Sequence, residues 1–325
     1  MNFTNTPRCV VFGEALVDTF HDRIVPGGAP FNVAAHLAGL GLKPHLVSRI
    51  GHDDAGQLLR VLAHRMDLDL AGVQVDPQHQ TGRVDVLEGP TGHVFQIAQD
   101  QAYDHIDAND ALDTTLDYAG SHPTWLYFGT LALRSAHSRA SLDAMRSNLV
   151  HRAFVDLNWR DAGTTPEQAL DALHQVSVLK LSEEELERVL NWLGQPGKHA
   201  RAIPAAGDYR GEILALMYDI DLEWLLVTHG DQGASAWSAD GVCAAYVPAE
   251  PVPHMQDTVG AGDAFSAMAL AGLMTERPIG QLLRQSVAFA SAICGVRGAL
   301  PRQADFYRHW QHDDVRKHQD AHAQA

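Results

Sequence analysis

Short apolar runs alternate with amphipathic stretches along most of the chain. In the amphipathic stretches the apolar residues recur every three or four positions, which is the spacing of one helix face. Gln57–Met66, Glu183–Leu193 and the shorter Glu212–Met217 show this pattern. Strands that alternate with helices favour a doubly wound α/β fold, in which helices flank a mainly parallel sheet on both faces. The runs that predict strands are Val10–Phe12, His45–Ile50, Trp125–Phe128, Ala153–Leu157, Val176–Leu181 and Leu225–Thr228.

A second pattern interrupts this alternation in the first third of the chain. Thr81–Leu87 and His93–Ala98 alternate apolar and polar residues on either side of the turn-forming Gly89–Gly92, which predicts a β-hairpin. Together with the strand-like stretch Phe20–Val25, the hairpin would form a small β-sheet lid over a cleft. We therefore expect residues 1–18, 28–75 and 107–325 to form the core domain, and residues 19–27 and 76–106 to form the lid.

Two segments carry no periodic pattern. Gly194–Gly207 predicts a surface loop, and the polar tail Gln311–Ala325 predicts a frayed end.

The composition is that of an ordinary globular protein, with 46% hydrophobic and 20% charged residues. The 24 Lys and Arg residues are outnumbered by 40 Asp and Glu residues, which gives a formal net charge of -16. Such a charge repels a phosphate backbone, so nucleic acid is excluded as a partner. The 19 histidines are scattered and show no metalloprotease spacing, so the sequence indicates no metal site among them.

Several features argue against a membrane or secreted protein. The uncharged stretch Ile24–Leu42 contains prolines and glycines, so it would not span a bilayer as one helix. Glu14 and Asp18 interrupt the only hydrophobic stretch near the N-terminus, which excludes a signal peptide. The cysteines, Cys9, Cys243 and Cys294, are far apart and form no framework. We therefore expect a cytoplasmic protein without membrane contacts.

The most informative motif is Asp257–Phe265, with the sequence DTVGAGDAF, directly before an apolar helix over Ala264–Leu273. Gly260, Ala261 and Gly262 would present backbone N–H groups at the start of this helix, where a phosphate is favoured. A carboxylate beside such a site is a poor phosphate ligand, so Asp263 is expected to accept the proton of an attacking hydroxyl. The alternative is an ordinary helix N-cap preceded by glycines.

This motif resembles the C-terminal signature of the ribokinase-like, PfkB-type sugar kinases. Gly27–Ala34 followed by Leu37–Gly41 is similar to the N-terminal signature of that family, and its Gly-Gly-Ala-Pro form resembles fructokinases. Cys9–Asp18 matches the fructokinase-type first strand, and Arg297–Pro301 resembles the usual C-terminal ending. The resemblance implies an ATP-dependent kinase that phosphorylates a primary hydroxyl of a sugar, with fructose O6 as the expected acceptor.

The resemblance also implies roles for individual residues. The polar groups of Asp18 and Asn32, and the bare backbone of Gly28, match positions that hold the sugar. Asn158 and Arg160 follow a strand end in Asp156-x-Asn158-x-Arg160, which resembles the fructokinase and ketodeoxygluconate kinase pattern; a surface salt bridge is the alternative for Arg160. In the lid, Arg83, Phe95 and Gln96 are expected to close over the sugar, although Phe95 could instead pack the sheet.

The nucleotide side is implied in the same way. Glu185 matches the family glutamate that places hydrated Mg²⁺, with Ser182 in place of the usual Asn, although a Ser-capped helix also favours an acidic first turn. Lys180 is expected to meet a phosphate. Thr228, Gly230 and Gly233 match the nucleotide loop, for which a plain β-turn is the alternative.

Several readings of the activity remain open. A 2-keto-3-deoxygluconate kinase, a ribokinase or a nucleoside kinase would share the fold, and a catalytically inactive sugar-binding regulator would share the sugar site. A dinucleotide-dependent oxidoreductase is rejected because Gly13-Glu14-Ala15-Leu16 follows the first strand in place of G-x-G-x-x-G. The sequence does not decide whether a monovalent cation such as K⁺ is needed.

The lid also bears on the oligomeric state. Val84, Val86, Val94 and Ile97 are expected to form an apolar strand face that needs cover, because an isolated hairpin is only marginally stable. The cover would be the sugar site, a second subunit or both. Related sugar kinases often dimerise through this lid, so the resemblance implies a homodimer.

Overall fold

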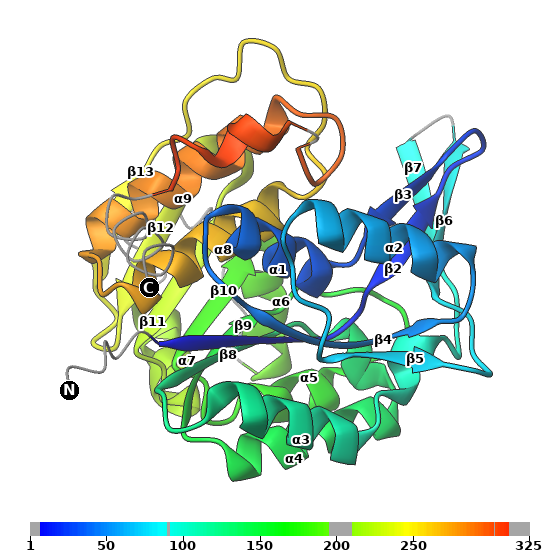
Figure 1. Cartoon of the computed structure of the whole chain (residues 1–325). Helices are drawn as coiled ribbons and strands as arrows, with labels where there is room; N and C mark the ends of the chain where they lie inside the picture. The colour runs from blue at the N-terminus through cyan, green and yellow to red at the C-terminus, as the bar shows by residue number, and fades with distance from the viewer. Residues whose placement is uncertain (1–6, 90–91, 195–209, 302, 312–325) are drawn as a thin grey trace, which may run out of the picture.

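A nine-stranded sheet crosses the centre of the molecule, with helices on both faces (Figure 1). It is seen in a computed structural model that describes residues 7–89, 92–194, 210–301 and 303–311. Seven neighbouring strands of this sheet pair in parallel, and two more, β12 (Ala234–Ser238) and β13 (Cys243–Val247), add an antiparallel edge. In spatial order the strands are β13 (Cys243–Val247), β12 (Ala234–Ser238), β11 (Trp224–Thr228), β10 (Val178–Ser182), β9 (His151–Asp156), β8 (Thr124–Phe128), β1 (Arg8–Phe12), β4 (His45–Gly51) and β5 (Val73–Asp76).

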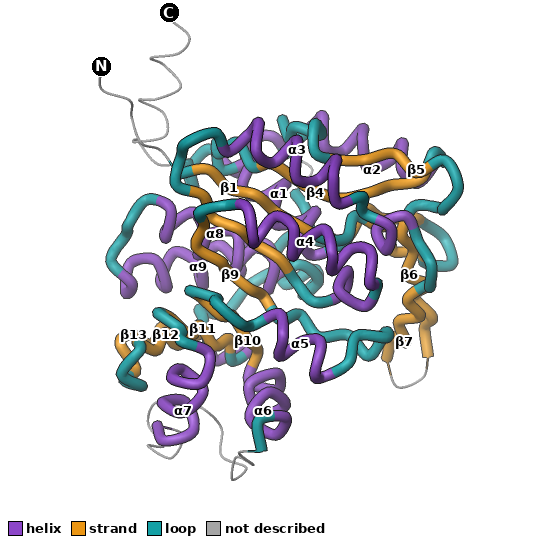
Figure 2. Tube along the Cα trace, turned by 90° about the horizontal axis from the view of Figure 1, so that it is seen from below, coloured by secondary structure: helices purple, strands orange, loops and turns teal. Residues whose placement is uncertain are grey.

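The two helical layers bury opposite sides of the same strands. In β1, Cys9 and Val11 join one apolar cluster, and Val10 and Phe12 join the other, because successive side chains of a strand point to opposite faces. One layer contains α1 (Ala29–Gly39), α2 (Asp54–Arg65), α8 (Ala261–Met274) and α9 (Ile279–Cys294). The other contains α3 (Ala108–Ala119), α4 (Ala136–Asn148), α5 (Pro166–Ala172), α6 (Glu183–Trp192) and α7 (Arg210–Ile220) (Figure 2).

This architecture confirms the predicted doubly wound α/β fold. Each of the six predicted strand runs overlaps an observed strand, and the three helical patterns correspond to α2, α6 and α7. Strands β12 and β13 were not predicted. Within the described ranges, no helix is long and apolar enough to cross a membrane. The predicted loop Gly194–Gly207 and tail Gln311–Ala325 lie, apart from their first residues, outside the described residues.

A separate small sheet extends from one side of the core (Figure 1). The stretch Phe20–Val25 is not a single strand, because Phe20 N donates to Arg23 O at 2.8 Å and closes a turn between two strands. Leu16–Asp18 pairs within this sheet, although the predicted boundary assigned it to the core. In spatial order the strands are β3 (Ile24–Gly27), β2 (Leu16–Thr19), β6 (Gly82–Gly89) and β7 (Gly92–Ile97).

The register of the small sheet separates its two faces. Asp18 pairs with Val84, which pairs with Ile97, and Val86 pairs with Phe95, so these five residues share what we call the Asp18 face. The intervening positions form the opposite face, here named the Arg83 face; they include Ile24, Arg83, Leu87 and Gln96.

The expected apolar face of the hairpin needs two corrections. Val94 pairs with Leu87 and so belongs to the Arg83 face, whereas Val84, Val86 and Ile97 belong to the Asp18 face. Val94 and Ile97 are three positions apart in one strand, and such positions do not share a face. Val84 and Val86 are also buried within their own chain, and Val84 packs in the same cluster as Leu16. These two valines therefore do not need a second subunit to cover them.

Candidate active site

The two signature segments meet where helices α1 and α8 begin. Asn32, in the first turn of α1, donates from Nδ2 to Asp263 Oδ2 at 2.8 Å, across 231 positions of sequence. Asn32 is 4% exposed, and its Oδ1 is buried without a hydrogen-bond partner among the described residues. A buried acceptor left without a partner is costly unless a ligand supplies the donor. The arrangement therefore brings the predicted sugar site to the predicted base.

The start of α8 has the form of an anion-binding site. Its N-cap is Gly260, which has a φ of 79° and no side-chain capping bond. A Cβ at Gly260 would lie 2.4 Å from Ala299 Cβ, so only glycine fits this position. Of the predicted amides at Gly260, Ala261 and Gly262, that of Ala261 is already used, because it donates to Thr258 O at 3.3 Å. The first N–H groups of a helix have no carbonyl partner within it, so the amides of Gly262 and Asp263 lie at the positive end of α8. Asp263 lies three residues after the N-cap, so it is not the capping residue.

A lysine reaches the same helix end from the sheet. Lys180 Nζ lies 3.3 Å from where a Cβ of Gly262 would be, which places the ammonium group beside the first turn of α8. The ammonium donates to Asp156 Oδ1 at 3.0 Å, and Ser266 Oγ donates to Asp156 Oδ2 at 2.7 Å. Burial alone would lower the pKa of Lys180, but the Asp156 and Glu185 carboxylates outweigh it and raise the pKa. Lys180 therefore stays charged at the anion site.

Burial raises the pKa of Asp156, and three further carboxyl groups at the site also have raised pKa values. Burial, together with the nearby Asp156 charge, raises the pKa of Asp263 to about 6. Burial and the Asp263 charge likewise raise the pKa of Asp18 to about 6 and that of Glu14 to about 7. The positive charge of Arg160 opposes the rise in pKa at Glu14, Asp18 and Asp263. The exposed guanidinium of Arg160 therefore lies within electrostatic reach of all three carboxyl groups.

Glu14 was not among the predicted site residues. It is 3% exposed, its Oε1 accepts from Ala29 N at 3.2 Å, and its Oε2 has no hydrogen-bond partner among the described residues. Gly28 allows this close approach, because a Cβ there would lie 2.6 Å from Glu14 O. The signal in the sequence was the position of Glu14, two residues after the predicted strand Val10–Phe12 and four residues before Asp18.

Glu185 serves two backbone segments at once. Its Oε2 accepts from Ser182 N at 2.7 Å while Ser182 Oγ accepts from Glu185 N at 3.2 Å, which is a capping box at the start of α6. Its Oε1 accepts from Trp159 N at 2.7 Å and so holds the loop that contains Asn158 and Arg160. The carboxylate is half-buried, and each oxygen keeps a lone pair beyond these bonds. The group therefore fits water-mediated binding of Mg²⁺.

The predicted nucleotide loop follows β11. Thr228 ends this strand and its Oγ1 lies 3.4 Å from Leu181 O. Gly230 begins the short 3-10 helix η4 (Gly230–Gln232), and no heavy atom lies within 4 Å of the position of its Cβ. Gly233 has a φ of 104°, and a Cβ there would lie 2.0 Å from Val247 O. The fold itself therefore requires Gly233, whereas Gly230 leaves open space at the loop.

The three predicted lid contacts are divided between the two faces of the small sheet. Phe95 lies on the Asp18 face and is 58% exposed. Arg83 and Gln96 lie on the Arg83 face, where Arg83 forms an exposed ion pair with Asp85 at 3.2 Å. The register thus brings Phe95 to the side of Asp18 and keeps Arg83 and Gln96 away from it.

Comparisons with known proteins show the family of the chain. The chain matches the model of the pfkB family of carbohydrate kinases over residues 4–304. It is 30% identical to a fructokinase of Salmonella typhimurium over 322 residues, covering 92% of this chain and 97% of that protein.

Two solved structures show the same fold. The Xylella fastidiosa fructokinase with bound ATP has a TM-score of 0.77 and 21% identity, covering 97% of this chain and 99% of that one. A double mutant of the Vibrio cholerae fructokinase, with fructose, ADP and a potassium ion bound, has a TM-score of 0.72 and 23% identity, covering 93% and 98%.

Proposed function

Because the chain belongs to the pfkB family of carbohydrate kinases, we propose that it transfers the terminal phosphoryl group of ATP to O6 of fructose. The observation that carries this proposal is the hydrogen bond between Asn32 and Asp263, which joins the sugar signature to the carboxylate at the anion site. The fructokinase of Salmonella typhimurium, at 30% identity, and the Gly-Gly-Ala-Pro form of the N-terminal signature support fructose as the acceptor.

In the proposed mechanism, Asp263 accepts the proton of the attacking hydroxyl. The new O–P bond forms as the bond between the terminal phosphorus and the β–γ bridging oxygen breaks, and ADP leaves. A pKa of about 6 suits this role, because the carboxylate is ionised at neutral pH and still more basic than an ordinary Asp. Asn32 keeps the carboxylate oriented through its Nδ2.

The charge on the transferring group is stabilised by groups that are already in place. The amides of Gly262 and Asp263 and the ammonium of Lys180 converge on the start of α8, where they would meet the phosphates of ATP. Asp18, Asn32, Asn158 and Arg160 would bind the sugar hydroxyls. Thr228 and Gly230 would contact the nucleotide, and Glu185 would hold Mg²⁺ through water. Mg²⁺ supplies neutralisation of the triphosphate charge. A monovalent cation such as K⁺ is also proposed, because the Vibrio cholerae fructokinase holds a potassium ion.

A screen of sugars for ATP-dependent release of ADP tests the proposal. We expect fructose to give the highest kcat/KM among fructose, 2-keto-3-deoxygluconate, ribose and a nucleoside. A higher value for any of the other three would replace fructose but keep the kinase. Sugar binding without ADP release, measured by calorimetry on the same preparation, would instead indicate an inactive sugar-binding regulator.

We also propose a homodimer that forms through the Arg83 face. Ile24 and Leu87 lie on this face and are 55% and 48% exposed. Exposed apolar side chains on a sheet are typical of a surface that is covered by a partner. Light scattering of the wild type and of an Ile24→Lys variant tests this: we expect a dimer for the first and a monomer for the second.

A further inference from the structure

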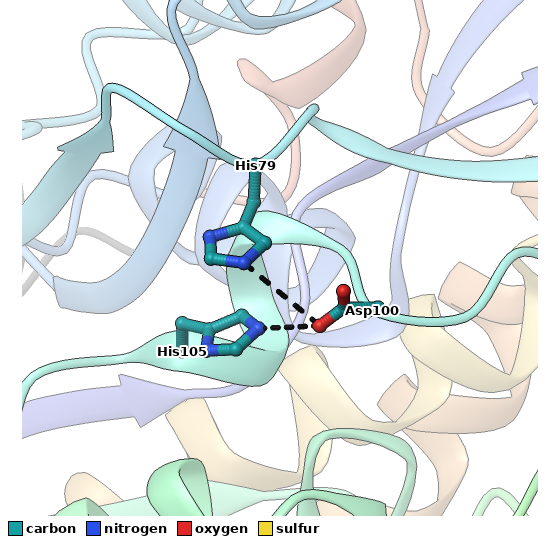
Figure 3. A group of neighbouring side chains, drawn as sticks. All are labelled: His79, Asp100 and His105. Carbon is teal, nitrogen blue, oxygen red and sulfur yellow. Dashed lines mark hydrogen bonds and ion pairs between the residues drawn. The ribbon is translucent and has the colours of Figure 1, made fainter.

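A group of two histidines and an aspartate lies where the small sheet joins the core (Figure 3). His79 belongs to the segment that connects β5 to β6. Asp100 belongs to the segment that connects β7 to the short 3-10 helix η1 (Ala102–His105), and His105 ends that helix. One ligand atom from each residue lies within 4.8 Å of the other two. The segment that enters the β6–β7 hairpin and the segment that leaves it therefore supply the group together.

The side chains point their ligand atoms toward one another. Asp100 Oδ1 lies 2.7 Å from His105 Nε2 and 3.9 Å from His79 Nε2 (Figure 3). The two imidazole rings stack with centroids 3.7 Å apart and an interplanar angle of 15°. Both rings thus present an Nε2 atom to the same carboxylate oxygen, and the three atoms can face one ion.

A buried carboxylate fixes the orientation of His79. His79 Nδ1 lies 3.1 Å from Asp76 Oδ2, and Asp76 is 1% exposed. Asp76 is itself held, because its Oδ1 accepts from the N–H groups of Gln78 and His79 and its Oδ2 pairs with Arg49 Nε at 2.7 Å. An Nδ1–H that donates to a carboxylate leaves the Nε2 lone pair free for a metal ion. Histidines that ligate metals are commonly oriented in this way.

From this geometry we propose that His79, Asp100 and His105 bind one divalent transition-metal ion, with Zn²⁺ as the best match. Two imidazoles and one carboxylate suit Zn²⁺, whereas Mg²⁺ prefers oxygen ligands alone. A cavity of about 430 Å³ lies beside the group and is lined in part by His79, His105 and His137. A water or an external ligand in this cavity would complete the coordination of the ion.

The ion would tie together the two segments on which the small sheet is mounted. Without the ion, those segments are joined at this point by the stacking of the His79 and His105 rings and by the hydrogen bond from Ala102 N to Gln80 O at 2.8 Å. If the small sheet closes over the sugar, as the proposed function implies, the ion would make the two segments that connect the sheet to the core more rigid. The site itself does not depend on the proposed activity, since none of its residues belongs to the sugar or nucleotide sites.

Titration of the full-length protein with Zn²⁺, without ATP or sugar, tests the proposal. Because the chain has 19 histidines, the decisive quantity is the number of ions lost in matched variants. We expect Asp100→Asn and His105→Gln each to bind one ion fewer than the wild type. Asp100 is 75% exposed at its side chain, so its variant is expected to fold. His64→Gln, which changes an exposed histidine on α2, is the control and should bind as many ions as the wild type. Equal stoichiometry in all four proteins would overturn the proposal.

Two further measurements sharpen the test. Asp76→Asn keeps all three ligands, so it should bind the ion with about 10- to 100-fold lower affinity and unchanged stoichiometry. Hydrogen exchange should slow at residues 78–81 and 98–101 when Zn²⁺ is added to the wild type, and not in Asp100→Asn. Zinc binding that leaves exchange in both segments unchanged would place the ion elsewhere and overturn the proposal.

Discussion

Asp53 and Asp263 both stand at the positive end of a helix, yet their pKa values move in opposite directions. Asp53 is the N-cap of α2, and its oxygens accept from Gly56 N, Thr81 N and Thr81 Oγ1 at 2.6–2.8 Å. Burial alone would raise the pKa of Asp53, but these hydrogen bonds outweigh it and lower the pKa. Asp263 accepts one side-chain hydrogen bond, from Asn32, and its pKa rises to about 6.

The difference lies in what each carboxylate is given to bind. A capping carboxylate is satisfied by the protein's own donors, so its charge stabilises the fold. At α8 the N-cap is a glycine, and an incoming anion would meet the amides of the first turn and the Lys180 ammonium group, which Asp156 holds in place. Asp263 therefore keeps an unstable charge, which costs some folding stability and gives it the basicity that a proton acceptor needs.

The largest expected effect comes from removing the base. Asp263→Asn should lower kcat by about 10²–10⁴-fold, because the amide cannot accept the proton of the hydroxyl. The same variant should melt at a higher temperature than the wild type, since a charge held in an unfavourable environment is gone. Steady-state kinetics and thermal unfolding measure the two effects. A variant that keeps most of its turnover would remove Asp263 from the mechanism.

The pH dependence of the rate should show the raised pKa directly. Only the ionised form of Asp263 accepts a proton, so kcat/KM should fall tenfold per pH unit below about 6. A profile measured between pH 4.5 and 8 at saturating ATP would show this acidic limb. Glu14→Gln is the control, because Glu14 also has a raised pKa. If the limb vanishes in that variant, the titrating base is Glu14.

Removing the capping carboxylate should affect stability and leave the chemistry intact. Asp53→Ala should lower the free energy of unfolding by about 0.5–2 kcal/mol, with kcat of the folded protein unchanged. Because folding lowers the pKa of Asp53, its contribution is present above the ordinary pKa of an Asp and is lost as the pH falls. Denaturant unfolding at pH 7 and in acid should therefore show a smaller difference between variant and wild type in acid.

The smallest effect is expected at the partner of the base. Asn32→Ala removes a neutral side chain whose Oδ1 awaits a donor, so it should raise the KM for the sugar by about two- to tenfold. Nucleotide affinity should stay nearly unchanged. In the wild type the hydrogen bond from Asn32 lowers the pKa of Asp263. Losing this bond should raise that pKa, so the acidic limb of the rate profile should move to higher pH. Equal weakening of sugar and ATP binding would contradict the assignment.

The α/β core and the elements that carry the signatures could be predicted from the sequence, because apolar runs and glycine motifs determine the structure of the segment in which they occur. Strands β12 and β13 were not predicted, because their sequences, ASAWS and CAAYV, are short and rich in small residues. Such segments show too weak an apolar pattern to predict a strand. The turn at Phe20–Arg23 was missed because an aromatic residue stands where a strand pattern would continue.

Contacts between distant segments were harder to predict. The histidine–aspartate group depends on two chain segments that converge at the small sheet, and no spacing of His79, Asp100 and His105 resembles a metal motif. The position of Lys180 beside Gly262 likewise depends on how β10 and α8 meet. Strand register decides on which face of the small sheet Phe95, Arg83 and Gln96 lie. The alternating pattern does not give this register, because it does not show how β2 pairs with β6.

The hydrogen bond between Asn32 and Asp263 has a consequence for the protein as it is made. Its partners are 231 positions apart, and Gly260 packs against Ala299, so the site closes only when nearly the whole chain is available. During synthesis, β1 and α1 leave the ribosome long before α8 and expose apolar faces that have no cover. A chain interrupted before residue 299 would hold most of the sugar signature but would lack the contact that fixes its anion site.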